Sequence, residues 1–262
     1  MTIKGIIFDY GGTLDTAGCH WGKMLWHAYE RQQVPVTEQQ FRDAYVFGER
    51  ALARNPIIKP DDTFHRTLSA KIRLEMEHLC TQGTWDASEN DFKEKHEAVL
   101  NDLYGEVQRI TAHSAEVLIE LQKRYPMVLV SNFYGNIACV LREFGLEKFF
   151  LDIVESAVVG IRKPDPKIFT LGVETLNNHH LSPTTQHPPP ITQHPSSPQL
   201  GGARGTITPS EILVVGDSFY KDILPAQKAG CKTAWFKGEG WTDETFDETI
   251  PDLIINDLQE LL

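Results

Sequence analysis

Closely spaced cysteines, which disulfide frameworks and zinc sites require, are missing from this sequence. The four cysteines lie far apart and none is part of a C-x-x-C pair: Cys19, Cys80, Cys139 and Cys231. Neither a structural zinc site nor a disulfide-stabilised scaffold is therefore indicated. Free thiols suit a reducing compartment, so we predict a cytoplasmic protein.

Long apolar runs and an excess of positive charge are missing as well. No segment approaches the roughly 18 apolar residues of a membrane span, and the apolar run in MTIKGIIFD is too short for a signal peptide. The 36 Asp and Glu residues outnumber the 25 Lys and Arg residues, which gives a net charge of -11. Nucleic-acid binding needs basic residues to neutralise phosphates. We therefore expect neither a membrane nor a nucleic-acid partner.

Short apolar runs rich in β-branched residues recur along the 262 residues. Six are evident, at 3–9, 127–131, 151–156, 211–217, 232–236 and 252–256. Unbroken apolar runs, rather than alternating ones, are typical of strands buried on both faces of a parallel sheet. Helical patterns such as SAEVLIELQKRY separate several of them. The sequence therefore predicts an α/β fold with a doubly wound, Rossmann-like parallel sheet.

A different pattern occupies residues 17–107, where four helical segments follow one another without a strand between them. Thr37 with Gln40, and Ser88 with Asp91, have the spacing of residues that cap helix N-termini. We interpret residues 17–107 as a helical unit inserted after the first strand. Residues 1–16 and 108–262 would then form the core.

Residues 177–208 contain six prolines, four histidines and a repeated TQHP. This composition does not build a packed element, so we predict a disordered insertion in the core. The histidines could in principle bind a metal ion, but polar proline-rich segments are usually solvated.

Polar residues end three of the predicted strands. Asp9 is the last residue of the first run, Ser131 with Asn132 ends the second, and Asp217 is the last residue of the fourth. Lys163, in GIRKPDP, comes after the third. Taken singly, Asp9 could cap a helix and Lys163 could be a solvated charge. Together, at the carboxyl edge of an open sheet, they form an inventory for phosphoryl transfer.

These residues lie in four segments, DYGGT from Asp9, VLVSN, RKPDP and GDSFYKD from Asp217. In this order they closely resemble the motifs of the haloacid dehalogenase (HAD) superfamily. The resemblance implies a Rossmann-like core over residues 1–16 and about 108–262, with a helical cap between the first and second motifs. It also implies a hydrolase, most often a phosphatase that acts on a small phosphorylated metabolite.

The resemblance further implies a set of roles. Asp9 would attack phosphorus and form an aspartyl phosphate, and Lys163 would neutralise the charge that gathers there. Asp222 would support the site from outside the metal's ligands. Mg2+ would be held by Asp9, the carbonyl of Gly11 and Asp217, and the substrate would be bound by Gly12, Thr13, Ser131 and Asn132.

Gly11 departs from the family motif, in which this position carries an aspartate that protonates the leaving oxygen and later activates water. Such assistance is worth about 10² to 10⁴ in rate, so leaving groups of high pKa should react slowly here. Acyl, anhydride and aryl phosphates should suffer less. His20 has a suitable pKa range for a replacement acid.

Other functions stay open from sequence alone. A dehalogenase lacks the same aspartate, but the acidic GDSFYKD segment would repel a carboxylate substrate. A phosphonate hydrolase needs a Schiff-base lysine in the cap, for which Lys23, Lys59 and Lys71 are available. A pseudoenzyme that only binds phosphate ligands is a third possibility. The sequence also leaves open a monomer or a homodimer, and which cap residues face the site, among Trp21, Trp26, Tyr29, Phe47 and Arg50.

Overall fold

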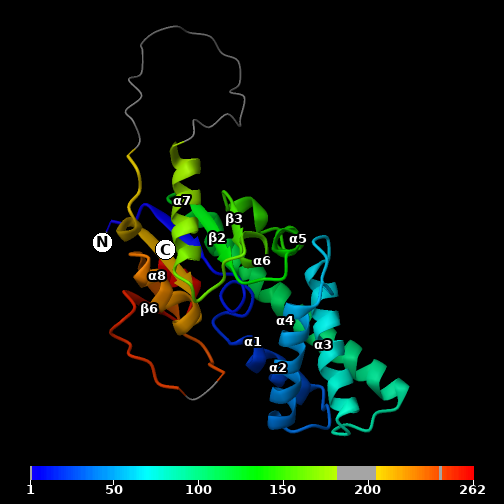
Figure 1. Cartoon of the computed structure of the whole chain (residues 1–262). Helices are drawn as coiled ribbons and strands as arrows, with labels where there is room; N and C mark the ends of the chain where they lie inside the picture. The colour runs from blue at the N-terminus through cyan, green and yellow to red at the C-terminus, as the bar shows by residue number, and fades with distance from the viewer. Residues whose placement is uncertain (1, 182–204, 242–243) are drawn as a thin grey trace.

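The fold is built on one six-stranded sheet, which confirms the predicted α/β class (Figure 1). The computed structural model describes residues 2–181, 205–241 and 244–262. Every neighbouring pair of strands is parallel, and the strand order is β3-β2-β1-β4-β5-β6. The strands are β1 (Gly5–Phe8), β2 (Met127–Ser131), β3 (Ile153–Glu155), β4 (Ile212–Gly216), β5 (Lys232–Phe236) and β6 (Leu253–Ile255).

The apolar runs are strands because both faces of the sheet are covered. All residues of β1, β2 and β4 are buried. Side chains alternate between two cores, since Phe8 belongs to one cluster and Ile7 to another. A run without polar alternation can satisfy this arrangement, whereas an exposed sheet face could not accommodate it.

Eight helices surround or extend from the sheet. They are α1 (Trp21–Arg31), α2 (Glu38–Arg54), α3 (Phe64–Thr81), α4 (Glu89–Leu121), α5 (Ile137–Glu143), α6 (Ser156–Val159), α7 (Lys167–Leu181) and α8 (Leu224–Lys228), within the described residues. Four single turns complete the elements, η1 (Glu147–Phe149), η2 (Pro209–Glu211), η3 (Phe219–Ile223) and η4 (Leu258–Leu261). Within that described part, no helix is both long and apolar enough to span a membrane.

The helices α1 to α4 follow β1 directly and precede β2, as the sequence predicts. Figure 1 shows α2, α3 and much of α4 standing away from the sheet. Both predicted capping boxes are confirmed, with Thr37 at the start of α2 and Ser88 at the start of α4. The boundary placed at residues 107 and 108 falls inside the continuous helix α4. The division into a core and a helical cap stays a prediction.

The predicted insertion at residues 177–208 is too wide at both ends. Asn177–Leu181 form the last turn of α7, and the buried Ile207 belongs to the hydrophobic cluster that contains Ile7 of β1. The Asn177 side chain accepts a hydrogen bond from the Ile207 N–H (2.8 Å) and donates one to its carbonyl (2.9 Å). A proline-rich composition cannot reveal such side-chain pairing. Residues 182–204 lie outside the described residues, with His187 and His194 among them.

Candidate functional site

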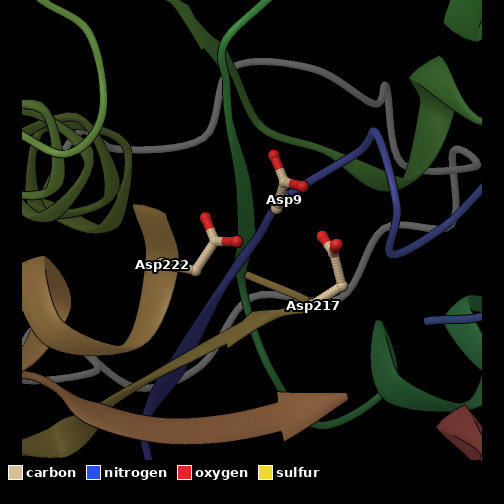
Figure 2. A group of neighbouring side chains, drawn as sticks. All are labelled: Asp9, Asp217 and Asp222. Carbon is tan, nitrogen blue, oxygen red and sulfur yellow. The ribbon is translucent and has the colours of Figure 1, made fainter. Parts of the chain in front are cut away.

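Three carboxylates gather at the carboxyl edge of the sheet. Asp9 follows β1 and Asp217 follows β4, the two strands between which the chain changes direction across the sheet. Asp222 comes from η3, a π-helical turn that directly follows. One oxygen from each lies within 4.8 Å of the others (Figure 2). Ligand sites of open α/β sheets occur at this topological switch point.

Lys163 lies against two of the three aspartates. Its Nζ donates to Asp9 Oδ1 and to Asp222 Oδ1, both at 2.6 Å. The lysine side chain is only 2% exposed, and those of Asp9 and Asp222 are 8% and 2% exposed. Burial lowers the pKa of the ammonium, but the two carboxylates outweigh it and raise that pKa overall. Lys163 is therefore a fixed positive charge beside Asp9.

One positive charge does not compensate three negative ones. Burial raises the pKa of Asp9 to about 6, against the lowering effect of Lys163, and the Asp222 charge adds to the increase. The pKa of the half-buried Asp217 is raised well above its usual range, chiefly because its carboxylate is removed from water. The negative charges of Asp222 and Asp9 add to this increase. A divalent cation would relieve this repulsion. The set of oxygen donors fits Mg2+, which prefers a few carboxylates together with water and phosphate oxygens.

Gly12 and Thr13 hold the carboxylates in place. Gly12 has φ +103°, and a Cβ there would lie 2.3 Å from the Asp217 carboxylate. Thr13 Oγ1 lies 3.4 Å from Asp9 Oδ2 and 3.3 Å from Asp217 Oδ1, and it accepts a hydrogen bond from the Asp217 N–H. The Gly12 N–H donates to Asp15 Oδ1 at 2.7 Å. Substrate contacts of Gly12 and Thr13 stay predictions.

Ser131 and Asn132 end β2 in different environments. Ser131 is buried and its hydroxyl has no hydrogen-bond partner among the described residues. An unpaired buried hydroxyl is costly unless a ligand completes it. Asn132 instead braces the lysine: it accepts from the Lys163 N–H (2.9 Å) and donates to the Lys163 carbonyl (3.1 Å).

A cavity of about 160 Å³ opens above the aspartates. The sheet side contributes the acidic cluster with Gly11, Asn132, Phe133, Tyr134, Lys163, Ser218 and Lys221, and helices α1 to α3 contribute Trp21, Tyr45, Glu49, Phe64, Thr67, Leu68 and Lys71, with His20 at the start of α1. Its volume would hold several waters or a small metabolite. The helices that follow β1 thus close one side of the cavity.

Gly11 leaves open space in this cavity. A Cβ at Gly11 would meet only Trp21, at 3.8 Å from Nε1, which is an ordinary contact. The Trp21 indole N–H donates to Asp15 Oδ2 at 3.0 Å. Burial raises the pKa of Asp15 to about 8. The hydrogen bond from the Gly12 N–H acts in the opposite direction and offsets part of this increase. Backbone geometry therefore does not require glycine at position 11, in contrast to position 12.

His20 lines the cavity but is poorly suited to replace the missing acid. Its Nδ1 accepts a hydrogen bond from the Gly22 N–H at 3.0 Å, so Nε2 carries the proton of the neutral ring. Burial, with smaller effects from Lys221 and Lys71, lowers the pKa of His20 to about 4. A neutral imidazole of this tautomer donates a hydrogen bond but transfers its proton reluctantly.

Of the five helical residues left open by sequence, only Trp21 lines this cavity. Trp26 and Tyr29 are buried among the helices, and Phe47 stacks on His78 with ring centroids 4.1 Å apart. Arg50 lines other surface grooves. Sequence reasoning missed Glu49, Tyr134 and Lys221, because their approach depends on how α2, η3 and the segment after β2 pack against one another.

Comparison with known proteins agrees with this geometry. The sequence model of the haloacid dehalogenase-like hydrolases matches residues 3–230. The phosphoglycolate phosphatase of Vibrio cholerae is 26% identical over 269 residues, covering 100% of this chain and 96% of that protein. The glyceraldehyde 3-phosphate phosphatase of Pyrococcus furiosus is 27% identical over 118 residues, which are 45% of this chain and only 37% of that protein.

Solved structures show the same fold. The magnesium-bound crystal structure of the HAD-hydrolase YfnB from Bacillus subtilis superposes with a TM-score of 0.54 at 18% identity, covering 100% of this chain and 97% of that one. With the family model matched over most of its length, this chain belongs to the haloacid dehalogenase-like hydrolases.

Proposed function

We propose that this hydrolase is a magnesium-dependent phosphatase that acts on a small phosphorylated metabolite through a covalent intermediate on Asp9. The observation that carries the proposal is the buried Asp9–Lys163–Asp222 arrangement, with Asp217 beside it, at the floor of the cavity. The phosphatase relatives support a phosphorylated substrate.

The first step uses Asp9 as the nucleophile. An oxygen of its carboxylate forms a bond to phosphorus as the bond from phosphorus to the leaving oxygen breaks, and the leaving group departs with that electron pair. Lys163 keeps Asp9 ionised through the 2.6 Å hydrogen bond and offsets charge on the phosphoryl group. Ser131 does not line the cavity, but its hydroxyl has no partner among the described residues, so a phosphoryl oxygen that reached it would accept a hydrogen bond.

In the second step, water attacks the phosphorus of the aspartyl phosphate, which releases inorganic phosphate and restores the Asp9 carboxylate. Asp9, the Gly11 carbonyl and Asp217 would hold Mg2+, with Asp222 supporting through Lys163. When bound, the ion supplies positive charge that neutralises the phosphate oxygens. Gly11 offers no side chain to take the proton from water, so we expect the covalent intermediate to persist.

The other activities receive less support from this site. Lys71 is the cap lysine that lines the cavity, but its ammonium is bonded to Glu49 and its pKa is raised well above the usual value despite burial. A Schiff base needs the neutral amine. The three clustered carboxylates, two of them buried, disfavour the haloacid carboxylate of a dehalogenase substrate.

Turnover of acetyl phosphate, p-nitrophenyl phosphate and a sugar phosphate, with and without Mg2+, tests the proposal. We expect metal-dependent hydrolysis of the first two by the wild type, and none by Asp9→Asn. Acid-quenched wild type should carry a phosphoryl group on Asp9 in mass spectra. Asp86→Asn is the matched control, because Asp86 is exposed and lies outside the cavity.

Two results would contradict the proposal. Hydrolysis that survives Asp9→Asn would exclude the covalent route. A wild type that binds Mg2+ but hydrolyses none of the three compounds would favour a phosphate-binding pseudoenzyme.

A further inference from the structure

The part of the cavity distant from Asp9 has its own chemistry. Its walls are the rings of Trp21, Tyr45 and Phe64, and the charged groups there are Lys71 and Glu49. The rings of Trp21 and Phe64 lie 5.8 Å apart. A hydrophobic core would not contain charged groups such as Lys71, because burying a charge is costly unless the charge is paired or a ligand completes its hydrogen bonds.

Lys71 retains hydrogen-bonding capacity. Its side chain is 9% exposed and donates to Glu49. The ammonium also lies over the Tyr45 ring, 4.6 Å from the centroid, and 5.8 Å from the Trp21 centroid. An ammonium has three N–H donors, and Glu49 is its one hydrogen-bonding partner among the described residues. Acceptors from a ligand could therefore complete it.

The carboxylate oxygens of Glu49, by contrast, already have hydrogen-bond partners. The Tyr134 hydroxyl lies 3.1 and 3.3 Å from its two carboxylate oxygens, in addition to the bond from Lys71. Lys71 and Tyr134 hold the pKa of Glu49 below its usual value, although burial opposes this. Lys221 adds a second positive charge that lines the cavity. Glu75 also lies close to Lys71, but burial raises its pKa to about 8, so at neutral pH Lys71 and the exposed Lys221 outnumber the Glu49 carboxylate at this end of the cavity.

Trp21 connects this positive end to the reacting end. Its indole lies 3.8 Å from the Cβ position of Gly11 and beneath the Lys71 ammonium. The hydrogen bond to Asp15 fixes the ring. A leaving group that departs past Gly11 thus has the indole beside it and Lys71 farther along.

We infer that the substrate is an aryl or enol phosphate, that is, the phosphate ester of a planar, unsaturated hydroxyl compound. The substrate also carries a carboxylate that reaches Lys71. This inference rests on the proposed phosphatase activity. The aromatic walls suit a planar group. The positive end suits an anion, and a carboxylate accepts charge-assisted hydrogen bonds from an ammonium. A phenolate or enolate leaves without a proton donor, which matches the absence of an acid at Gly11.

Matched aryl phosphates test the carboxylate. We would compare kcat/KM for 4-carboxyphenyl phosphate and 4-carbamoylphenyl phosphate, which are similar in shape and differ in charge. The wild type should prefer the carboxylate by about 10-fold or more, chiefly through KM, because a hydrogen bond to a charged group is worth that much. The double variant Lys71→Met/Glu49→Gln avoids leaving the half-buried Glu49 carboxylate without its cation and should bring the ratio close to one. Lys59→Met, exposed and outside the cavity, should keep the wild-type ratio.

Binding of the dephosphorylated products gives a readout without turnover. Quenching of tryptophan fluorescence should show that 4-hydroxybenzoate binds the wild type at least about 10-fold more tightly than 4-hydroxybenzamide. It should also bind more tightly than trans-4-hydroxycyclohexanecarboxylate, which has the carboxylate but no planar ring. Each preference should shrink in the double variant.

The outcomes separate the two proposals. If the aryl phosphates are hydrolysed without preference and the products bind alike, the inference is wrong while the phosphatase proposal holds. If no phosphate is hydrolysed but 4-hydroxybenzoate binds selectively, the phosphatase proposal fails and the assignment of the Lys71 end stands.

Discussion

At the scale of single residues, two adjacent glycines have different reasons to be glycine. Gly12 has a left-handed φ and no room for a Cβ beside Asp217, whereas a Cβ on Gly11 meets only an ordinary contact with Trp21. Gly12 is therefore a requirement of the backbone and the carboxylate cluster. At Gly11 a Cβ is accommodated, so steric hindrance does not require glycine at this position.

This contrast predicts opposite results from two neighbouring substitutions. Urea unfolding should show Gly11→Ala within about 1 kcal/mol of the wild type, and Gly12→Ala destabilised by more than about 2 kcal/mol through strain at positive φ and contact with Asp217. Gly11→Asp should fold and extend hydrolysis to sugar phosphates by up to about 10² to 10⁴ in rate. Equal stability losses at positions 11 and 12 would contradict the distinction.

Glu75 is a second residue whose environment matters, because its burial should make the stability of the protein depend on pH. It is fully buried on α3, where Tyr29 donates to one oxygen (3.3 Å) and the other oxygen has no partner among the described residues. Burial raises its pKa to about 8, although the Lys71 charge lowers it. The folded protein therefore retains a proton that the unfolded chain releases at lower pH.

The sign of the pH dependence follows. Above the unfolded pKa the folded state binds more protons, so Glu75 destabilises the wild type increasingly as pH rises toward 8, by at most about 1.4 kcal/mol per pH unit. Glu75→Gln lacks this proton, so its stability relative to the wild type should increase between about pH 5 and 8. Paired urea titrations at several pH values measure the difference. A constant difference would show that Glu75 is ionised in the folded protein.

At the scale of elements, helix ends connect α3 to the sheet side of the molecule. Glu143, on α5, accepts hydrogen bonds from the backbone N–H groups of Phe64 and His65 at the start of α3. It also accepts from the Tyr104 hydroxyl of α4 at 2.8 Å. An anion at a helix N-terminus satisfies free N–H donors and interacts favourably with the helix dipole. One side chain thus fixes three helices relative to one another.

Removing the Glu143 side chain should destabilise the protein more than removing a typical side chain near the surface. We expect Glu143→Ala to lower the free energy of unfolding by about 1–3 kcal/mol, because charged hydrogen bonds to α3 and Tyr104 are lost. Glu147→Ala is the control, since Glu147 forms an exposed pair with Arg142, of a kind worth about 0–1 kcal/mol. Similar losses in the two variants would show that the capping contact contributes little.

At the scale of the whole molecule, a segment that follows β5 holds the first helices against the sheet. The ring of Trp241 lies 5.1 Å from that of His20 and 4.9 Å from that of Tyr45, and the Arg42 guanidinium lies 4.3 Å above it. Arg42 also donates to the Trp241 carbonyl at 2.8 Å. Tyr45 and His20 line the cavity, so this contact affects the shape of the site.

Whether Gly22→Ala raises or lowers the stability of the protein tests this Trp241 contact. A Cβ there would lie 2.0 Å from the Trp241 ring. In an isolated helix, Gly to Ala stabilises by about 1 kcal/mol. If Trp241 packs as described, Gly22→Ala should destabilise and should speed amide exchange in α1 and α2. Combined with Trp241→Ala, which removes the clash, it should regain the helix benefit. A stabilising Gly22→Ala in the wild type would mean that the contact does not form in solution.

Much of the architecture could be predicted from local patterns. Strand positions followed from apolar runs, which report burial on two faces, and the starts of α2 and α4 followed from Thr37 and Ser88, because a capping box is a contact within four residues. The family followed from four short motifs in order. The placement of Asp9, Asp217 and Lys163 together agrees with those motifs, while their catalytic roles stay predictions.

Long-range contacts carried no such signal. Asn177 pairs with Ile207 across 30 residues, and Glu49 shares its carboxylate between Lys71 and Tyr134. Trp241 packs on Arg42, which lies 199 positions earlier in the chain. A side chain's neighbours across such separations depend on how whole elements pack, which residue type alone does not specify. Local chemistry in the sequence therefore determined the fold class, the family and the residues of the acidic cluster. The tertiary structure decided the far end of the cavity, because only packing brings Lys71 and the aromatic rings to face the aspartates.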